Sequence, residues 1–251
     1  MTTVVKLGGS VLEPWPAPEM LAALVRLARG GEVAVVHGGG KALTALLHRL
    51  GLGSEFRKGL RVTDAATLDA AVMALAGTVN TRLVAALNAA GVCAVGLTGA
   101  DAVAVQAERQ AELGAVGVIT AAAARLWRTL LDAGYTPVLA SLAVAPHSAD
   151  LLNVNADQFA AAVAAALGAE RLIFCTDVEG VLDGSGAPLH AATLDELRAL
   201  AAAGALRGGM LPKAAACAAA LEAGVAEVAI IGPRAAASLD AGVLAGTEVR
   251  R

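Results

Sequence analysis

Residues 33–43 read VAVVHGGGKAL, an apolar run that ends in three glycines and leads straight into an alanine- and leucine-rich segment. A run without polar alternation predicts a strand buried on both faces, and the segment after it has the composition of a helix. Residues 4–10, VVKLGGS, form a similar apolar run that ends in a glycine pair. Both segments predict strands of a parallel sheet that is covered by helices.

The rest of the chain alternates in the same way between short β-branched runs and longer segments of helical period. The expected fold class is α/β, a three-layer αβα sandwich around a mostly parallel central sheet, built by residues 1–251 as a single domain with a lobe boundary near residue 170. The predicted strands are residues 3–7, 33–36, 92–97, 137–141, 172–176 and 227–231. The predicted helices are residues 17–28, 41–50, 65–90, 121–133, 157–167, 193–203 and 213–223.

Composition excludes several classes of function. A net charge of -3 without a run of Lys or Arg gives no electrostatic surface for nucleic acid or an anionic membrane. Three cysteines without a CxxC pair argue against a disulfide framework or a zinc site. The chain runs from its first residues directly into a strand without a leader pattern, so we expect a cytoplasmic protein. The uncharged stretch at residues 83–100 is interpreted as a helix end and a buried strand, not as a membrane span.

Two glycine-rich loops follow predicted strands, at Gly8-Gly9 and at residues 38–40. Ligands of parallel sheets bind beyond the carboxyl ends of the strands. Glycines let the backbone approach a phosphate, and free N–H groups at a helix N-terminus supply donors. Each loop is therefore a candidate anion cradle, although glycine pairs after strands are commonly plain turns.

Two familiar nucleotide signatures fail at the second loop. A Walker loop requires Gly at position 35 and Ser or Thr at position 42, where Val35 and Ala42 stand. A dinucleotide fingerprint that starts at Gly38 requires Gly at position 43, which is Leu43. A nucleotide site in this chain must use a different loop.

The whole set of segments resembles the amino acid kinase family. The resemblance rests on the order KLGGS at 6–10, VHGGG at 36–40, TDVEGV at 176–181 and a late Lys213. KGLRVTD at 58–64, NVNAD at 153–157 and GGMLPK at 208–213 are similar to the branch whose acceptor is N-acetyl-L-glutamate, and the likeness runs from Val4 to about Thr247. It implies ATP- and Mg²⁺-dependent phosphorylation of the side-chain carboxylate of N-acetyl-L-glutamate to N-acetylglutamyl 5-phosphate, a step of arginine biosynthesis.

The resemblance also implies roles for individual residues. Lys6 and Lys213 would flank the transferred phosphoryl group as the catalytic pair, with Asp157 orienting both ammonium groups. Residues 1–170 would form an acceptor-binding and dimerisation lobe and residues 171–251 an ATP-binding lobe, with no residue assigned as a metal ligand. The acceptor would be held by Gly39, Gly40, Arg61 and Asn153. ATP would be held by Gly8, Gly9, Asp177, Gly180, Val181, Leu182, Gly209 and Met210.

Simpler interpretations stand beside these roles. Arg61 by itself is compatible with a solvated surface arginine, and Asn153 and Asp157 are compatible with N-caps of the following helix. Lys213 at a predicted helix start suggests an anionic partner, since a cation there opposes the helix dipole. His37 is expected to be a hydrogen-bonded structural histidine, not a base.

Other acceptors remain open on the same fold, among them carrier-protein-bound aminoadipate, glutamate, aspartate, carbamate or a nucleotide monophosphate. A non-catalytic amino-acid sensor is a further alternative, but it predicts loss of Lys6, Asp157 or Lys213, and all three are present. Arg207 departs from the family pattern beside the GGM segment and leaves the local nucleotide contacts open. The short segment before Lys6 predicts a homodimer that is insensitive to arginine.

Overall fold

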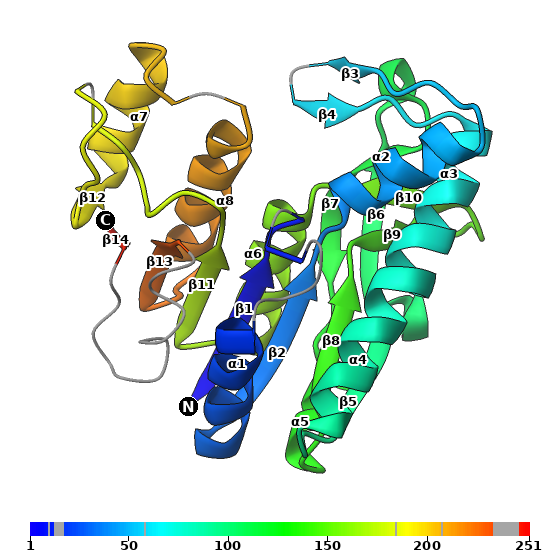
Figure 1. Cartoon of the computed structure of the whole chain (residues 1–251), viewed down its shortest axis with the longest axis horizontal. Coiled ribbons are helices and arrows are strands. Elements are labelled where there is room, and N and C mark those ends of the chain that lie inside the picture. The colour runs from blue at the N-terminus through cyan, green and yellow to red at the C-terminus, as the bar shows by residue number, and fades with distance from the viewer. Residues whose placement is uncertain (10, 13–17, 58, 184, 207, 233–245) are drawn as a thin grey trace.

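The computed structural model describes residues 1–9, 11–12, 18–57, 59–183, 185–206, 208–232 and 246–251 (Figure 1). Its centre is an eight-stranded sheet in which β1 (Thr2–Leu7) pairs in parallel with β2 (Glu32–His37) on one side and β11 (Arg171–Cys175) on the other. All pairs are parallel except that of β13 with β14. The full order is β12 (Ala191–Thr193), β14 (Thr247–Arg250), β13 (Glu227–Ile231), β11, β1, β2, β8 (Thr136–Ala140) and β5 (Ala94–Thr98).

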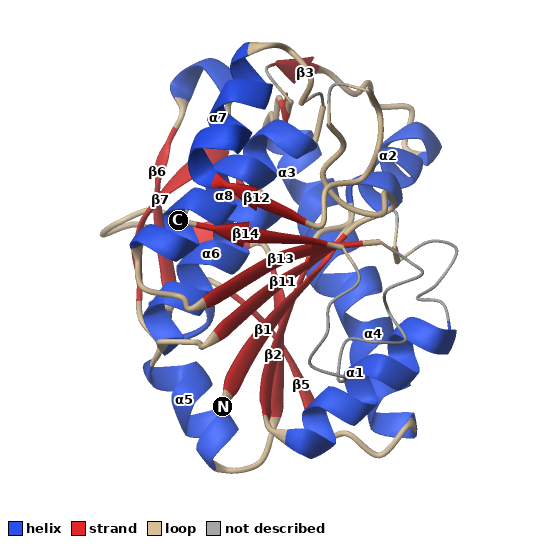
Figure 2. Ribbon diagram, turned by 90° about the vertical axis from the view of Figure 1, so that its left-hand side faces the viewer, coloured by secondary structure: helices blue, strands red, loops and turns tan. Residues whose placement is uncertain are grey.

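Helices cover both faces of this sheet, as Figure 2 shows. One face carries α1 (Pro18–Gly30) and α4 (Asn80–Ala89). The other carries α5 (Arg125–Asp132), α6 (Ala156–Leu167) and α8 (Met210–Glu222). Neighbouring strand residues therefore enter different cores: Val4 packs with the α6 side and Val5 with the α1 side. The predicted three-layer αβα class is confirmed.

The six predicted strands match β1, β2, β5, β8, β11 and β13 within two residues at each end. The remaining helices are α2 (Gly40–Arg49), α3 (Ala65–Ala71) and α7 (Leu194–Ala202), with single turns of 3₁₀-helix at Asp101–Val103 and Ala111–Leu113. A predicted helix at residues 121–133 is wrong at its start, because β7 continues to Ala122 and α5 begins only at Arg125.

A small barrel beside the central sheet was not predicted. It consists of β10 (Leu151–Val154), β7 (Val116–Ala122), β6 (Val105–Arg109) and β9 (Leu142–Val144). The strands approach closely at Gly117, where a Cβ atom would lie 2.8 Å from the Cβ of Ala107. β9 and β10 have only three and four residues and β6 is half polar, which gives little strand signal, whereas the β-branched residues at the start of β7 were a signal that the prediction missed.

The predicted helix at residues 65–90 is helical over nearly its whole length, but its middle turns, Val72–Val79, are π-helical. By length and composition the stretch Ala65–Ala89 is apolar enough to cross a membrane. In this fold the apolar side of the helix is buried, since Leu83 and Leu87 pack against the central sheet. The π-helical turns lie against the second glycine loop, where Leu75 and Val79 contact Gly39.

Candidate active site

Lys6 lies in β1, where every residue is buried, and its side chain is only 8 % exposed. A buried ammonium group without a partner is costly, so this position requires an anion. Its Nζ lies 2.7 Å from Oδ1 of Asp157, which comes from the first turn of α6. Two segments separated by about 150 residues thus meet at the end of the central strand.

The N-cap of α6 is Asn155, whose side chain accepts hydrogen bonds from the N–H groups of Asp157 (2.9 Å) and Gln158 (3.1 Å). The alternative interpretation of Asn153 or Asp157 as the cap is therefore wrong. Asn153 lies in β10, and its Nδ2 donates to Oγ1 of Thr63 at 3.2 Å. Because the cap is supplied by Asn155, the carboxylate of Asp157 is left to face the two lysines.

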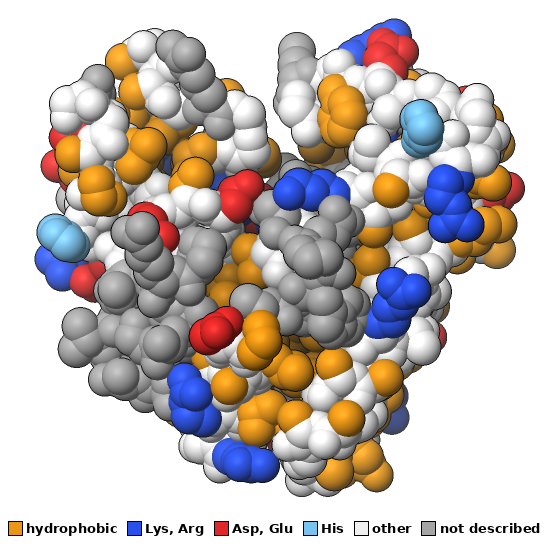
Figure 3. Space-filling view, in the orientation of Figure 1, with side chains coloured by type: hydrophobic (Ala, Val, Ile, Leu, Met, Phe, Trp, Pro, Cys, Tyr) orange, Lys and Arg blue, Asp and Glu red, His pale blue; other side chains and the backbone are white. Residues whose placement is uncertain are grey.

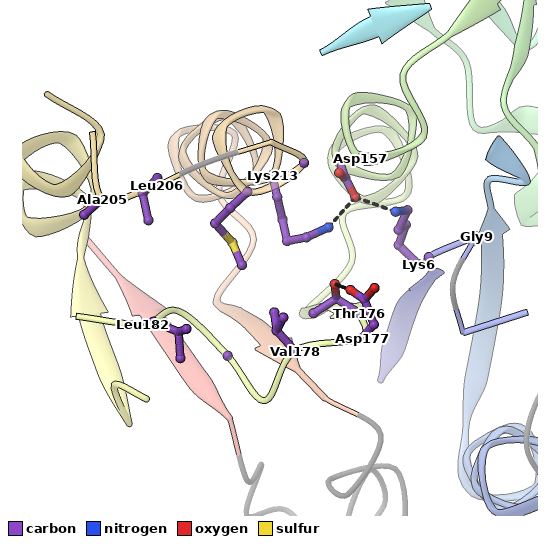
Figure 4. A pocket seen from close by; sticks show the side chains of 14 residues that line it. Lys6, Gly9, Asp157, Thr176, Asp177, Val178, Leu182, Ala205, Leu206 and Lys213 are labelled. Atoms are coloured by element: carbon purple, nitrogen blue, oxygen red, sulfur yellow. Dashed lines mark hydrogen bonds and ion pairs between the residues drawn. The ribbon is translucent and has the colours of Figure 1, made fainter. Parts of the chain in front are cut away.

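Lys213 completes the group, with its Nζ 2.9 Å from the same Oδ1 of Asp157 (Figure 4). It is the fourth residue of α8, which begins at Met210 and not at residue 213 as predicted. Its ammonium group also lies 5.3 Å from the ring centroid of Phe174. The anionic partner expected from its place near a helix start is Asp157.

Two ammonium groups and one carboxylate leave this buried cluster with one uncompensated positive charge. Burial lowers the pKa of Lys6, Lys213 lowers it further, and Asp157 opposes both. Burial alone would raise the pKa of Asp157, but Lys6 and Lys213 together outweigh it and hold that pKa below its usual range. Asp157 is ionised at neutral pH, so the cluster attracts an anion such as a phosphoryl group.

The low pKa of Asp157 predicts a loss of stability in acid. A carboxyl pKa depressed in the folded state stabilises the protein above the unfolded value of about 3.9 and loses this contribution as the pH falls through the folded value. We expect the difference in unfolding free energy between the wild type and Asp157→Asn to shrink from pH 6 to pH 3.5, measured by urea denaturation. A pH-independent difference would contradict this account of the cluster.

A cavity of about 500 Å³ opens on one side of the cluster, between the two halves visible in Figure 3. Seven of the eight residues predicted to hold ATP line it: Gly8, Gly9, Asp177, Gly180, Leu182, Gly209 and Met210. Val181 is placed differently, since it is fully buried and its N–H donates to Oγ1 of Thr247 at 2.8 Å.

A second cavity, of about 220 Å³, opens on the other side of the cluster. The four residues predicted to hold the acceptor, Gly39, Gly40, Arg61 and Asn153, all line it. Lys6, Gly9 and Asp157 line both cavities, so the lysine–aspartate pair forms part of their common wall. The two cavities therefore meet at the positively charged cluster that lies between them.

Arg61 is 8 % exposed, so its interpretation as a surface arginine is wrong. Its guanidinium group donates to the hydroxyl of Ser54, to the carbonyl of Gly40 (3.1 Å) and to Oγ1 of Thr44 (2.8 Å). It lies 4.5 Å from the ring centroid of Phe56, in the hairpin of β3 (Phe56–Arg57) and β4 (Leu60–Arg61). All these partners are neutral, which leaves the charge of Arg61 available to a carboxylate in the cavity.

Comparisons with known proteins agree with this geometry. The sequence model of the amino acid kinase family matches residues 1–232. The chain belongs to this family. Curated relatives named acetylglutamate kinase include one from Solibacter usitatus, 45% identical over 99% of this chain and 97% of its own length, and one from Acidobacterium capsulatum, 44% identical over 99% of both. The solved structure of smu.665 from Streptococcus mutans UA159 has a TM-score of 0.87 at 30% identity and covers 99% of this chain and 98% of its own.

Several residues that line the amino acid kinase cavities were not predicted from the sequence. Val178 and Leu206 line the larger cavity, and Leu43, Leu75 and Val116 line the smaller one. Val178 has a recognisable sequence signal, because it is the apolar residue of the polar loop TDVEG at 176–180. The other four are buried, and their residue types do not distinguish them from core residues. Ser10, Lys58 and Arg207 lie outside the described residues.

Proposed function

We propose that this chain is an ATP-dependent kinase that phosphorylates the side-chain carboxylate of N-acetyl-L-glutamate and yields N-acetylglutamyl 5-phosphate for arginine biosynthesis. One observation carries the proposal: Lys6 and Asp157 line both cavities, with Lys213 on the same carboxylate oxygen. A phosphoryl group that passes from one cavity to the other must cross this positive centre. The names of the curated relatives support the choice of acceptor.

In this mechanism an oxygen of the acceptor carboxylate bonds to the γ-phosphorus while the bond from that phosphorus to the ADP oxygen breaks. Lys6 and Lys213 donate hydrogen bonds to phosphoryl oxygens, where charge gathers in a loose transition state. Asp157 holds both ammonium groups in place through the carboxylate oxygen that they share. A carboxylate acceptor with a pKa of about 4.3 is already ionised at neutral pH, so no general base is needed.

Mg²⁺ would neutralise nucleotide phosphate charge. Among the described residues no group of three or more His, Cys, Asp or Glu side chains could hold a metal ion. Mg²⁺ in kinases is usually held by nucleotide phosphates, water and one or two carboxylates, so it does not require a cluster of three protein ligands. The protein's own contribution is then the pair of lysines and the glycine-rich backbone around the phosphates.

We propose that the two lobes divide the substrates. The larger cavity is lined by residues from 176 onward together with Lys6, Gly8, Gly9 and Asp157, and the smaller one only by residues up to 157. Residues 171–251 would hold ATP and residues 1–170 the acceptor. The homodimer and the cytoplasmic location stay predictions.

The acceptor is tested by coupling ADP release to NADH oxidation with ATP and Mg²⁺ present. N-acetylglutamate, glutamate and aminoadipate are compared at equal concentrations. We expect kcat/KM for N-acetylglutamate to exceed the others by at least roughly tenfold, since unpaired polar groups in a built site reject the wrong ligand. Equal use of glutamate, or a preference for aminoadipate, would reject the proposed acceptor.

Arg61→Lys is expected to raise the KM for N-acetylglutamate about tenfold or more and to leave the KM for ATP unchanged. Lysine cannot reproduce the fork of donors that reaches Gly40 and Thr44 while its charge faces the cavity. Arg57→Lys is the matched control, because Arg57 lies in the same hairpin but is exposed and paired with Glu55. Equal KM values in both variants would remove Arg61 from acceptor binding.

Gly180→Ala is expected to raise the KM for ATP about tenfold with little change in the KM for the acceptor. Gly180 has φ +146°, and a Cβ there would lie 2.5 Å from Oγ1 of Thr247, which accepts the hydrogen bond of Val181. Gly186→Ala is the control, because Gly186 has φ +89° but open space around a Cβ. Should both variants bind ATP equally well, the contact with Thr247 does not shape the nucleotide site.

A further inference from the structure

His37 is a buried titratable residue that the mechanism above does not use. It is the last residue of β2 and has no exposed surface. Its Nδ1 lies 2.8 Å from the carbonyl oxygen of Gly38, and its Nε2 lies 2.9 Å from Nδ2 of Asn80. Burial lowers the pKa of His37 to about 4, although the Gly38 carbonyl opposes this, so the ring is neutral at pH 7. One ring nitrogen faces a backbone carbonyl and the other faces a side-chain amide, so the neutral imidazole adopts a single tautomer.

Asn80 decides which ring nitrogen carries the proton. Its Nδ2 also donates to the carbonyl oxygen of Val138 at 2.9 Å, and a carbonyl can only accept. The amide NH₂ therefore faces both Val138 and His37, so Nε2 of His37 must accept its hydrogen bond. The proton is then on Nδ1, which donates to the carbonyl of Gly38. The chain of hydrogen bonds runs in one direction, from Asn80 through the imidazole to the glycine loop.

The surroundings hold Asn80 in this place. It begins α4 directly after the π-helix Val72–Val79 and is 4% exposed. Its Oδ1 lies against Gly96 of β5, so closely that any Cβ at that position would overlap it. The π-helix also packs tightly against the glycine loop, because a Cβ at Gly39 would lie 2.6 Å from Cδ2 of Leu75. Unusual helical turns of this kind are often found at functional sites.

The orientation of the Gly38–Gly39 peptide bond determines where the N–H of Gly39 points. The carbonyl of Gly38 and the N–H of Gly39 belong to one planar trans unit and point in opposite directions. When His37 holds the carbonyl inward, the N–H of Gly39 is turned away from the core. Gly39 and Gly40 line the smaller cavity, and no described residue accepts a hydrogen bond from the N–H of Gly39.

We propose that His37 and Asn80 are positioning residues that aim the N–H of Gly39 at the carboxylate-bearing acceptor in the smaller cavity. The inference rests on the proposed function of that cavity as the acceptor site. Neither side chain touches the acceptor, since His37 and Asn80 are buried behind the glycine loop. They act through the Gly38–Gly39 peptide.

Two substitutions separate the two contacts of the imidazole. The amide of His37→Asn takes the place of Nδ1 and can still donate to Gly38, but it loses Asn80. The amide of His37→Gln takes the place of Nε2 and can still accept from Asn80, but it loses Gly38. We expect His37→Gln to raise the KM for the acceptor roughly tenfold, the value of about one hydrogen bond, and His37→Asn to raise it less. The KM for ATP should stay within about twofold in both.

His48→Gln is the matched control, because His48 is exposed on α2. A purely structural histidine predicts a different pattern: both variants would lower the melting temperature and would change the two KM values together. That pattern, or a larger acceptor effect in His37→Asn than in His37→Gln, would overturn the inference.

A spectroscopic measurement on the wild type covers the case in which the variants fail to fold. We expect ¹⁵N NMR at pH 7 to show neutral His37 with the proton on Nδ1, and the amide signal of Gly39 to shift when N-acetylglutamate is added. A proton on Nε2, or an unmoved Gly39 signal, overturns the positioning inference even if the kinase is active. A shifted Gly39 signal without phosphorylation of N-acetylglutamate rejects the proposed function instead.

Discussion

Lys213→Met is expected to lower kcat by about 10² to 10³, measured as ADP release at saturating substrates. The loss corresponds to roughly 3 to 4 kcal/mol, the typical effect of one preorganised donor at the charge of a transition state. Methionine retains most of the apolar stem beside Phe174 but has no ammonium group to meet the phosphoryl oxygens. We expect a similar loss for Lys6→Met, because both Nζ atoms lie within 2.9 Å of the same oxygen of Asp157.

The control for this prediction is Lys41→Met. Lys41 is exposed on α2 and is not among the residues that line either cavity. It should retain wild-type kcat. If Lys213→Met keeps more than about a tenth of the wild-type kcat while its melting temperature is unchanged, the ammonium group of Lys213 does not stabilise the transferred phosphoryl group.

Asp157→Asn is expected to lower both activity and stability. The amide has the shape of the carboxylate but no charge, so Lys6 and Lys213, which are both buried, are left facing each other without compensation. Removing one partner of a buried charge group costs about 3 to 5 kcal/mol of unfolding free energy. We expect a loss of this order in urea denaturation at pH 7, together with a fall in kcat of about 10² or more, because the lysines lose their common anchor.

A double variant distinguishes this electrostatic explanation from a simple packing defect. In Asp157→Asn combined with Lys213→Met, only one ammonium group remains, and the repulsion is gone. The double variant should therefore be more stable than Asp157→Asn alone. Additive destabilisation would show that the three charges do not act as one unit.

The central sheet and its helices could be predicted from the sequence, because each of these elements has a strong local pattern of residues. Buried parallel strands such as β1 and β2 are continuous apolar runs, and helices such as α6 and α8 are long alanine-rich segments. The small barrel has a weaker signal. Two of its strands, β9 and β10, have only three and four residues, and the barrel depends on contacts such as that of Gly117 with Ala107, which lie in different strands.

Residue identity and order predicted which side chains form the candidate site, but not how they are arranged. The resemblance grouped Lys6, Asp157 and Lys213, and the structure brings their charged atoms to one carboxylate oxygen. Val181, assigned to ATP on the same grounds, is fully buried and does not line the larger cavity. A sequence motif specifies residue types and their spacing, whereas the direction in which each side chain points depends on the fold around it.

The sequence by itself determined the α/β class, the family and the set of charged residues, because periodicity, composition and motif order are local properties of the chain. Only the tertiary structure decided that Asn155 is the cap of α6, that Arg61 is buried among neutral partners, and that His37 is held by Asn80 beneath the glycine loop. Each of these depends on atoms that come from distant segments. Burial, pKa and hydrogen-bond direction are set by such neighbours, and they exist only once the chain has folded.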